Sequence, residues 1–165
     1  MANELTRDGY GQVEPNHLSA QRTGQIYAQL PAAAAITVLE NGMFAKYDYE
    51  AGEVNFTGDG EWMLVFNEVK LYGARETLKD FALKKTDAVD GEIVPRLFKT
   101  NVGDIFTTNC VDPEAANVAV VGAQLTPGAA GLLVVKTSET ENIWNVVALT
   151  TMPDGQDAVK LQRIA

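Results

Sequence analysis

The feature of this chain that most constrains its fold is the regular alternation of short apolar segments with turn-forming residues between Ile36 and Ile164. Two apolar runs between residues 36 and 47 flank the pair Asn41-Gly42, which can take the two positive φ angles of a type I′ turn. This spacing predicts a β-hairpin. A second hairpin is predicted near the C-terminus, where segments 143–150 and 158–164 flank a turn over residues 152–156.

Further apolar segments of strand length are separated by turn-forming residues in the same pattern. They predict strands over residues 61–69, 92–98, 103–111, 118–121 and 132–136, and Pro95 confines the second of these to an edge or a bulge. Residues 75–85 have imperfect helical spacing, although a charged loop held by Phe81 fits equally well. About eight short strands with at most one short helix predict a mainly β fold: a small antiparallel β-barrel or β-sandwich with an extended N-terminal arm.

The first 35 residues differ from the rest of the chain, because they are polar and carry apolar side chains at no sustained period. The sequence therefore predicts an extended N-terminal arm over residues 1–35 and a β-rich globular domain over residues 36–165. One interpretation of the arm is a disordered leader, since chain ends are loose unless something holds them. An arm that becomes ordered on a partner is the other interpretation, and the side chains of Tyr10, Ile26, Tyr27 and Leu30 favour it.

The charge balance limits the classes of function. The chain has 165 residues, of which 22 are acidic and 13 are basic, for a net charge of −9. This balance argues against a nucleic-acid groove, which needs Lys and Arg, and against binding to an anionic membrane surface. No apolar run has the length of a signal peptide or of a membrane span, so we expect neither export by the usual route nor a transmembrane segment.

Reactive side chains are few. The single cysteine, Cys110, has no partner for an internal disulfide, and we interpret it as a small buried or half-buried thiol in a strand of a protein made in the cytoplasm. The single histidine, His17, lies in the arm, which argues against a Ser-His-Asp or Cys-His triad. One His and one Cys do not build the usual zinc site, and no glycine-rich phosphate loop is present in the sequence. Trp62 and Trp144 have apolar neighbours and are assigned to the core.

Three groups of carboxylates remain as candidates for chemistry. They are Asp48 with Glu50 and Glu53, then Asp59 with Glu61, and finally Asp87 with Asp90 and Glu92. A glycosidase would need two carboxylates converging in a cleft, and an EF-hand calcium site would need oxygen ligands at a fixed spacing that the third group lacks. All three groups fall in turn-like segments, where acids are normally solvated. The sequence therefore predicts no enzyme, no cofactor and no resident metal ion.

Several segments of the sequence, taken together, resemble one class of proteins. They are the polar arm, the segment Val38–Phe44, the segment Val102–Asn109, and the ending formed by Trp144–Val147 and Ala158–Leu161. In this combination the chain is similar to the capsid decoration (cement) proteins of tailed bacteriophages. The resemblance covers most of the chain.

The resemblance implies a structural virion protein, made in the host cytoplasm, that binds the outer surface of the capsid. Such a protein bridges neighbouring subunits of the major capsid protein and stabilises the expanded shell, without nucleic-acid or membrane partners and in some cases as a trimer. The arm is then expected to contact the capsid. The candidate contact residues are the apolar anchors Tyr10, Val13, Leu18, Ile26, Tyr27 and Leu30 and the polar residues Arg7 and Arg22.

Two expectations follow from this interpretation. Removal of residues 1–30 should leave the globular domain folded and abolish attachment to the shell. The alternative function is a soluble β-sandwich binding module for carbohydrate or a metal ion, which exposed aromatic side chains aligned on one sheet face would favour. An enzyme would instead need a pocket with two close carboxylates of perturbed pKa.

Overall fold

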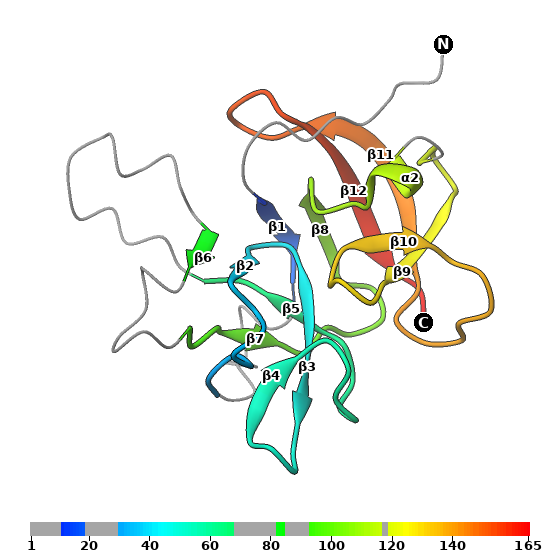
Figure 1. The fold of residues 1–165 in the computed structure, drawn as a ribbon. Coiled ribbons are helices and arrows are strands. Elements are labelled where there is room, and N and C mark those ends of the chain that lie inside the picture. The colour runs from blue at the N-terminus through cyan, green and yellow to red at the C-terminus, as the bar shows by residue number, and fades with distance from the viewer. Residues whose placement is uncertain (1–10, 19–29, 68–81, 85–92, 117–118) are drawn as a thin grey trace.

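The computed structural model describes residues 11–18, 30–67, 82–84, 93–116 and 119–165, which form two antiparallel β-sheets and a two-stranded ribbon (Figure 1). In spatial order the six-stranded sheet contains β1 (Val13–His17), β8 (Ile105–Thr108), β12 (Asp157–Arg163), β11 (Trp144–Thr151), β9 (Gln124–Pro127) and β10 (Leu133–Val135). The four-stranded sheet contains β4 (Glu53–Asn55), β3 (Phe44–Asp48), β5 (Met63–Val65) and β7 (Leu97–Phe98). The ribbon pairs β2 (Val38–Glu40) with β6 (Ala82–Lys84).

The predicted mainly β class is confirmed, in the form of a sandwich. The described strands leave both sheets open, and no closed barrel forms among them. The one helix in the described part of the chain is the single turn α2 (Pro113–Ala116). It begins with the combination that favours a helix start, because the Asp112 carboxylate accepts the backbone N–H of Glu114 at 3.0 Å and Pro113 needs no N–H partner.

The hairpin predicted at Asn41-Gly42 is wrong. A turn does form there, with the Met43 N–H donating to the Glu40 carbonyl at 3.2 Å. Gly42 alone of the pair has a positive φ, 93°, which corresponds to a type II turn and not to the type I′ turn of a hairpin. The strands on either side then pair with different partners, since β2 joins β6 whereas β3 joins β4 and β5.

The C-terminal hairpin is confirmed. β11 and β12 pair from Trp144 opposite Arg163 to Thr151 opposite Asp157, with a bulge between Val146 and Ala148. The outer half of this hairpin, the orange and red ribbon in Figure 1, extends beyond the part of the sheet that β8 and β9 cover.

Other predicted elements have mixed outcomes. Residues 119–121 form no strand, and Val120 and Val121 are 58% and 65% exposed in a turn before β9. The segment around Pro95 contributes only the two residues of β7, at the edge of its sheet, as proline requires. Of the predicted helix over residues 75–85, residues 82–84 form β6 and the others lie outside the described residues.

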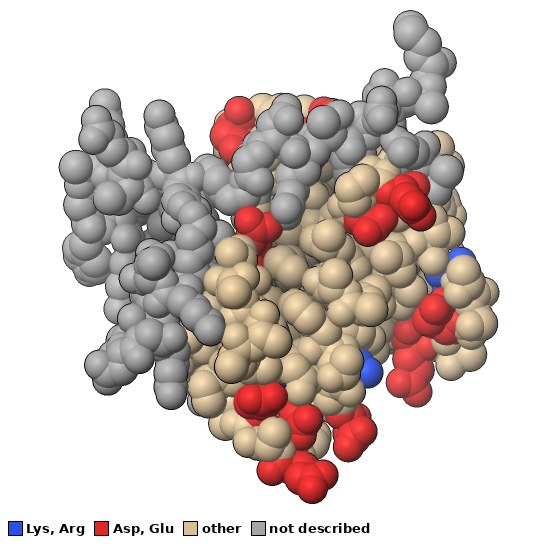
Figure 2. Space-filling view, in the orientation of Figure 1, with Lys and Arg blue, Asp and Glu red and all other residues tan. Residues whose placement is uncertain are grey.

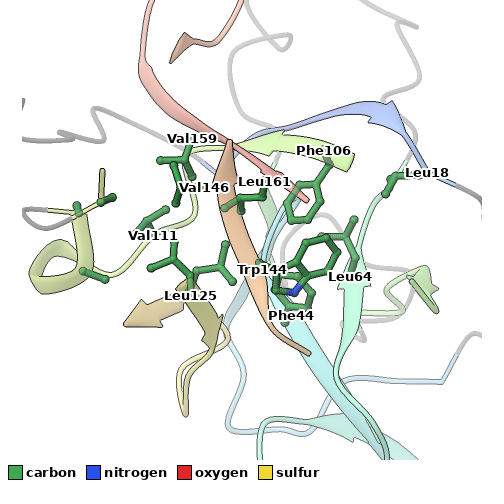
Figure 3. Packing of buried hydrophobic residues seen from close by; sticks show 14 residues of the cluster. Leu18, Phe44, Leu64, Phe106, Val111, Leu125, Trp144, Val146, Val159 and Leu161 are labelled. Carbon is green, nitrogen blue, oxygen red and sulfur yellow. The ribbon is translucent and has the colours of Figure 1, made fainter. Parts of the chain in front are cut away.

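One core cluster, here called the joining core, connects the two sheets (Figure 3). The ring of Phe44 of β3 packs against both Phe106 of β8 and Trp144 of β11, with ring centroids 6.1 and 5.7 Å away. The Phe106 and Trp144 rings meet edge to face at 4.7 Å, a geometry that contributes about 0.5–1.5 kcal/mol beyond simple burial. The prediction that Trp144 is a core residue is confirmed, while Trp62 is half-buried with the Lys46 ammonium 4.9 Å from its ring centroid.

A second core cluster lies against the four-stranded sheet and includes Leu39, Tyr47, Met63 and Cys110. Cys110 is fully buried, as predicted, but it lies after the end of β8 and not in a strand. Its thiol donates to the Asn41 carbonyl at 3.3 Å. The part of the chain that the structure describes contains no helix of the length and apolarity needed to cross a membrane.

Candidate functional site

Residues 11–18, the first described part of the predicted arm, are built into the six-stranded sheet. β1 pairs antiparallel with β8, which places Val13 opposite Thr108 and Glu14 opposite Thr107 (blue strand in Figure 1). Leu18, directly after β1, is 3% exposed and belongs to the joining core, and Val13 packs against the same cluster. Over these residues the chain is therefore a docked edge strand, whereas the sequence predicted an extended arm. The sequence pattern did not indicate this, because apolar residues without a regular period can still pack through a neighbouring strand.

This N-terminal segment enters the sheet through a close crossing of backbones. A Cβ atom built on Gly11 would lie 2.6 Å from the Cys110 sulfur. A Cβ atom on Gly42 would collide with the Thr108 hydroxyl and lie 2.7 Å from the Gln12 carbonyl oxygen. These distances are too short for any side chain, so glycine at both positions is a condition for docking the segment here.

Four polar side chains hold the segment against the turn between β11 and β12. The Gln12 backbone N–H donates to Asn109 Oδ1 at 2.6 Å, and Gln12 Nε2 donates to Asp154 Oδ2 at 2.5 Å. Asn109 Nδ2 donates to Gln156 Oε1 at 3.2 Å, and Gln156 Nε2 donates to Asp154 Oδ2 at 2.7 Å. We call these four residues the polar ring, because their hydrogen bonds form a closed circuit. It links Gln12 to residues 97 and 142 positions further along the chain.

The polar ring is built around an ionised carboxylate. The side-chain amide of Gln156 is the largest influence that holds the pKa of Asp154 below its ordinary value, and partial desolvation opposes it. The Gln156 backbone N–H and the Gln12 side chain lower this pKa further. Each of these donors favours the charged form, so the polar ring and the ionisation of Asp154 support each other.

A cleft of about 470 Å³ lies beside the polar ring. The described residues that line it are residues 11–15, Asn41, Phe66, Asn67, Met152 and Pro153. Four distant parts of the chain therefore meet here: the N-terminal segment, the turn at Asn41, the residues directly after β5 and the turn between β11 and β12.

A pair of amides holds the part of the cleft wall that Asn41 and Asn67 form. Asn41 Nδ2 donates to the Asn67 carbonyl at 3.1 Å, and the Asn67 backbone N–H donates to Asn41 Oδ1 at 2.7 Å. The side-chain oxygen of Asn67 in turn accepts the Arg96 backbone N–H at 2.9 Å. These bonds fix the positions of the two asparagines.

Of the candidate contact residues predicted from the sequence, Val13, Leu18 and Leu30 lie in the described part of the chain. Val13 and Leu18 pack against the joining core, and half-buried Leu30 packs against the second core. The remaining candidates, Arg7, Tyr10, Arg22, Ile26 and Tyr27, lie outside the described residues.

The polar ring was not found by sequence reasoning. The turn over residues 152–156 was predicted, but nothing local to Asp154 or Gln156 indicates that their partners lie at Gln12 and Asn109. Such a pairing depends on which strands become neighbours, and a single sequence does not contain that information.

The predicted carboxylate groups behave as turn residues where they are described. The Asp48 carboxylate accepts the Ala51 backbone N–H at 2.9 Å and the Asn55 amide at 3.2 Å, and these bonds hold its pKa below the ordinary value. Acidic side chains gather over the turn between β3 and β4 on the face shown in Figure 2. Within the described residues no group of three or more His, Cys, Asp or Glu is placed to hold a metal ion, and residues 87–92 lie outside them.

Aromatic side chains do not line one sheet face in the part of the chain that the structure describes. Tyr49, in the turn after β3, is 60% exposed and is the single exposed aromatic residue there. The pattern that would favour a carbohydrate-binding module is thus missing from the described residues.

Comparisons with protein-family models, with curated proteins and with solved structures each found no match for this chain.

Proposed function

We propose that this protein is a structural virion protein that binds the outer surface of a tailed-phage capsid. In this role it bridges neighbouring major capsid subunits and stabilises the expanded shell. The proposal combines the resemblance of the sequence to capsid decoration proteins with the mainly β sandwich fold. The single observation that supports it most directly is the docking of residues 11–18 onto the sheet.

A protein that reinforces a shell must carry load from its attachment point to its own core. Residues 1–10, which include the candidates Arg7 and Tyr10, connect directly to Gly11 at the backbone crossing. Tension applied through them would act on the β1–β8 hydrogen bonds, on the polar ring and on Leu18 in the joining core. The N-terminal segment is therefore suited to act as a mechanical anchor.

Attachment of this kind does not require a tight single contact. On an icosahedral lattice, a protein that touches two subunits converts its second contact into an intramolecular event, and avidity multiplies weak contacts by factors of about 10²–10⁴. A polar N-terminal sequence with a few apolar anchors suits such repeated contacts.

The test is to remove residues 1–10 and to measure co-sedimentation with expanded shells of the cognate phage. We expect the truncated protein to remain folded, with unchanged amide signals for Val13 and Leu18, and to lose attachment. A matched control is Val121→Ala, which changes an exposed residue of the sandwich and should leave attachment intact. Normal decoration by the truncated protein would refute the role of the N-terminus, and failure of the intact protein to bind any expanded shell would refute the proposed function.

A further inference from the structure

The cleft beside the polar ring has the size of a site for a side chain or a short segment, since ligand pockets in proteins range over roughly 300–1,000 Å³. Its described lining includes the apolar side chains of Val13, Phe66, Met152 and Pro153. Both polar atoms of the Asn41 side-chain amide are already hydrogen-bonded to the Asn67 backbone. Apolar contact is thus the main interaction that the walls offer.

The N-terminal segment lines this cleft with consecutive residues, from Gly11 to Pro15. Successive side chains of a strand point to opposite faces, so a cleft above one face would be lined by alternate residues. Within β1 the lining residues Val13, Glu14 and Pro15 are consecutive, which indicates that the cleft follows the edge of the strand. Among the described strands β1 is the outermost of its sheet, so this edge can accept an added strand. Pro15 has no backbone N–H, which limits the pairing to a short stretch around Val13 and Glu14.

The described residues that line the cleft carry negative charge only. Glu14 is exposed and is the one charged side chain among the described lining residues. Asp154 follows Pro153 directly and is ionised within the polar ring. The described lining contains no Lys or Arg, and the whole chain has a net charge of −9. A partner with positive charge beside its apolar group would be complementary to this rim.

We propose that the cleft is a docking site for a short extended segment of a partner protein, in which a large apolar side chain is flanked by Lys or Arg. The apolar side chain enters the cleft between Phe66 and Met152, the backbone pairs with the edge of β1, and the basic residues lie near Glu14. This inference goes beyond the proposed attachment to a shell. It concerns residues other than 1–10, so either proposal can fail while the other holds.

The experiment is a titration of the full-length protein, labelled at methionine methyl groups and backbone amides, with the acetylated and amidated peptide Lys-Val-Leu-Val-Lys. The Met152 methyl signal, assigned through a Met152→Leu variant, and the Val13 amide signal should shift and saturate. The matched peptide Glu-Val-Leu-Val-Glu should bind about fivefold or more weakly. The peptide Lys-Ser-Ser-Ser-Lys, which keeps the charge and lacks the apolar group, should leave the Met152 methyl unchanged.

Two variants test the charge on the rim. Glu14→Lys should reverse the preference between the Lys and Glu peptides, whereas Glu50→Lys, an identical charge change in the exposed turn after β3, should leave it unchanged. If Glu14→Lys disturbs the amide spectrum of the free protein, Glu14→Gln should still reduce the preference. The proposal is overturned if Met152 and Val13 do not respond to the Lys peptide, or if Glu50→Lys changes binding as much as Glu14→Lys does.

Discussion

Gly42 lies where three segments of backbone come together. Its φ of 93° is a conformation that side chains disfavour, and the Thr108 hydroxyl and the Gln12 carbonyl occupy the space where a Cβ atom would be. The residue therefore has two separate reasons to be glycine: its own conformation and the close approach of the N-terminal segment.

Gly42→Ala should lower the free energy of unfolding by about 2 kcal/mol or more, because the strain of a left-handed conformation and the steric clash add. Gly122→Ala is the matched control, since Gly122 has a similar φ of 91° but a Cβ atom there would meet nothing within 4 Å. Urea unfolding of both variants measures the difference. Equal losses would show that the crossing at Gly42 contributes nothing.

The stability of a Leu18 variant tests whether the N-terminal segment is docked, because Leu18 is the side chain that this segment buries in the joining core. It is 3% exposed in the joining core, so Leu18→Ala should cost about 2–5 kcal/mol of stability. Val121→Ala, at a position that is 65% exposed, should change stability by no more than about 0.5 kcal/mol. A Leu18→Ala variant as stable as the Val121→Ala variant would show that the segment is not docked in solution.

At the scale of elements, the hairpin of β11 and β12 holds the N-terminal segment in place. Its turn supplies Asp154 and Gln156 to the polar ring and supplies Met152 to the cleft. The turn is itself closed by two backbone bonds, Met152 N–H to the Gln156 carbonyl at 2.7 Å and Gly155 N–H to the Met152 carbonyl at 2.9 Å. A locally stable hairpin thereby stabilises a strand that enters from the other end of the chain.

The contribution of this hairpin to the stability of the fold should depend on pH. The pKa of Asp154 is lower in the folded state than its ordinary value of about 3.9, so its ionised form binds the donors better and stabilises the fold. This stabilisation is complete above the ordinary value and disappears as the pH falls through the lower folded-state pKa. The difference in unfolding free energy between the natural protein and Asp154→Asn should therefore be constant near neutral pH and shrink toward zero in acid.

The control for this prediction is Gln12→Ala, which removes one donor to Asp154 and should itself cost about 1 kcal/mol near neutral pH. In that background the effect of Asp154→Asn should be smaller. A pH-independent difference, or an unchanged one in the Gln12→Ala background, would contradict the coupling.

At the scale of the whole molecule, the joining core makes the two sheets one structural unit. Phe44 and Leu64 come from the four-stranded sheet, while Phe106 and Trp144 come from the six-stranded sheet, and all four are fully buried together. Backbone bonds also cross between them, since the Phe44 N–H donates to the Gly131 carbonyl at 2.8 Å. A shared core of this kind should unfold in one cooperative transition.

Truncation should reveal where the folded unit begins. Removal of residues 1–10 should leave the melting temperature nearly unchanged, whereas removal of residues 1–18 should lower it by about 10 °C, because β1 and the burial of Leu18 are lost. The expectation that residues 1–30 can be removed without cost to the domain is revised accordingly. Calorimetry of the two truncated proteins decides the matter, and equal melting temperatures would place the boundary after residue 18.

The sequence by itself determined the β class, the turn over residues 152–156 and the burial of Cys110 and Trp144. These features depend on local pattern and on side-chain polarity, which a single chain displays directly. Only the tertiary structure decided that β2 pairs with β6 and not with β3, that residues 11–18 form an edge strand, and that Val121 is exposed. The physical reason is that each of these outcomes depends on which distant segments of the chain become neighbours. Gln12 and Asp154 are 142 positions apart, and their contact leaves no trace in the local pattern of either segment.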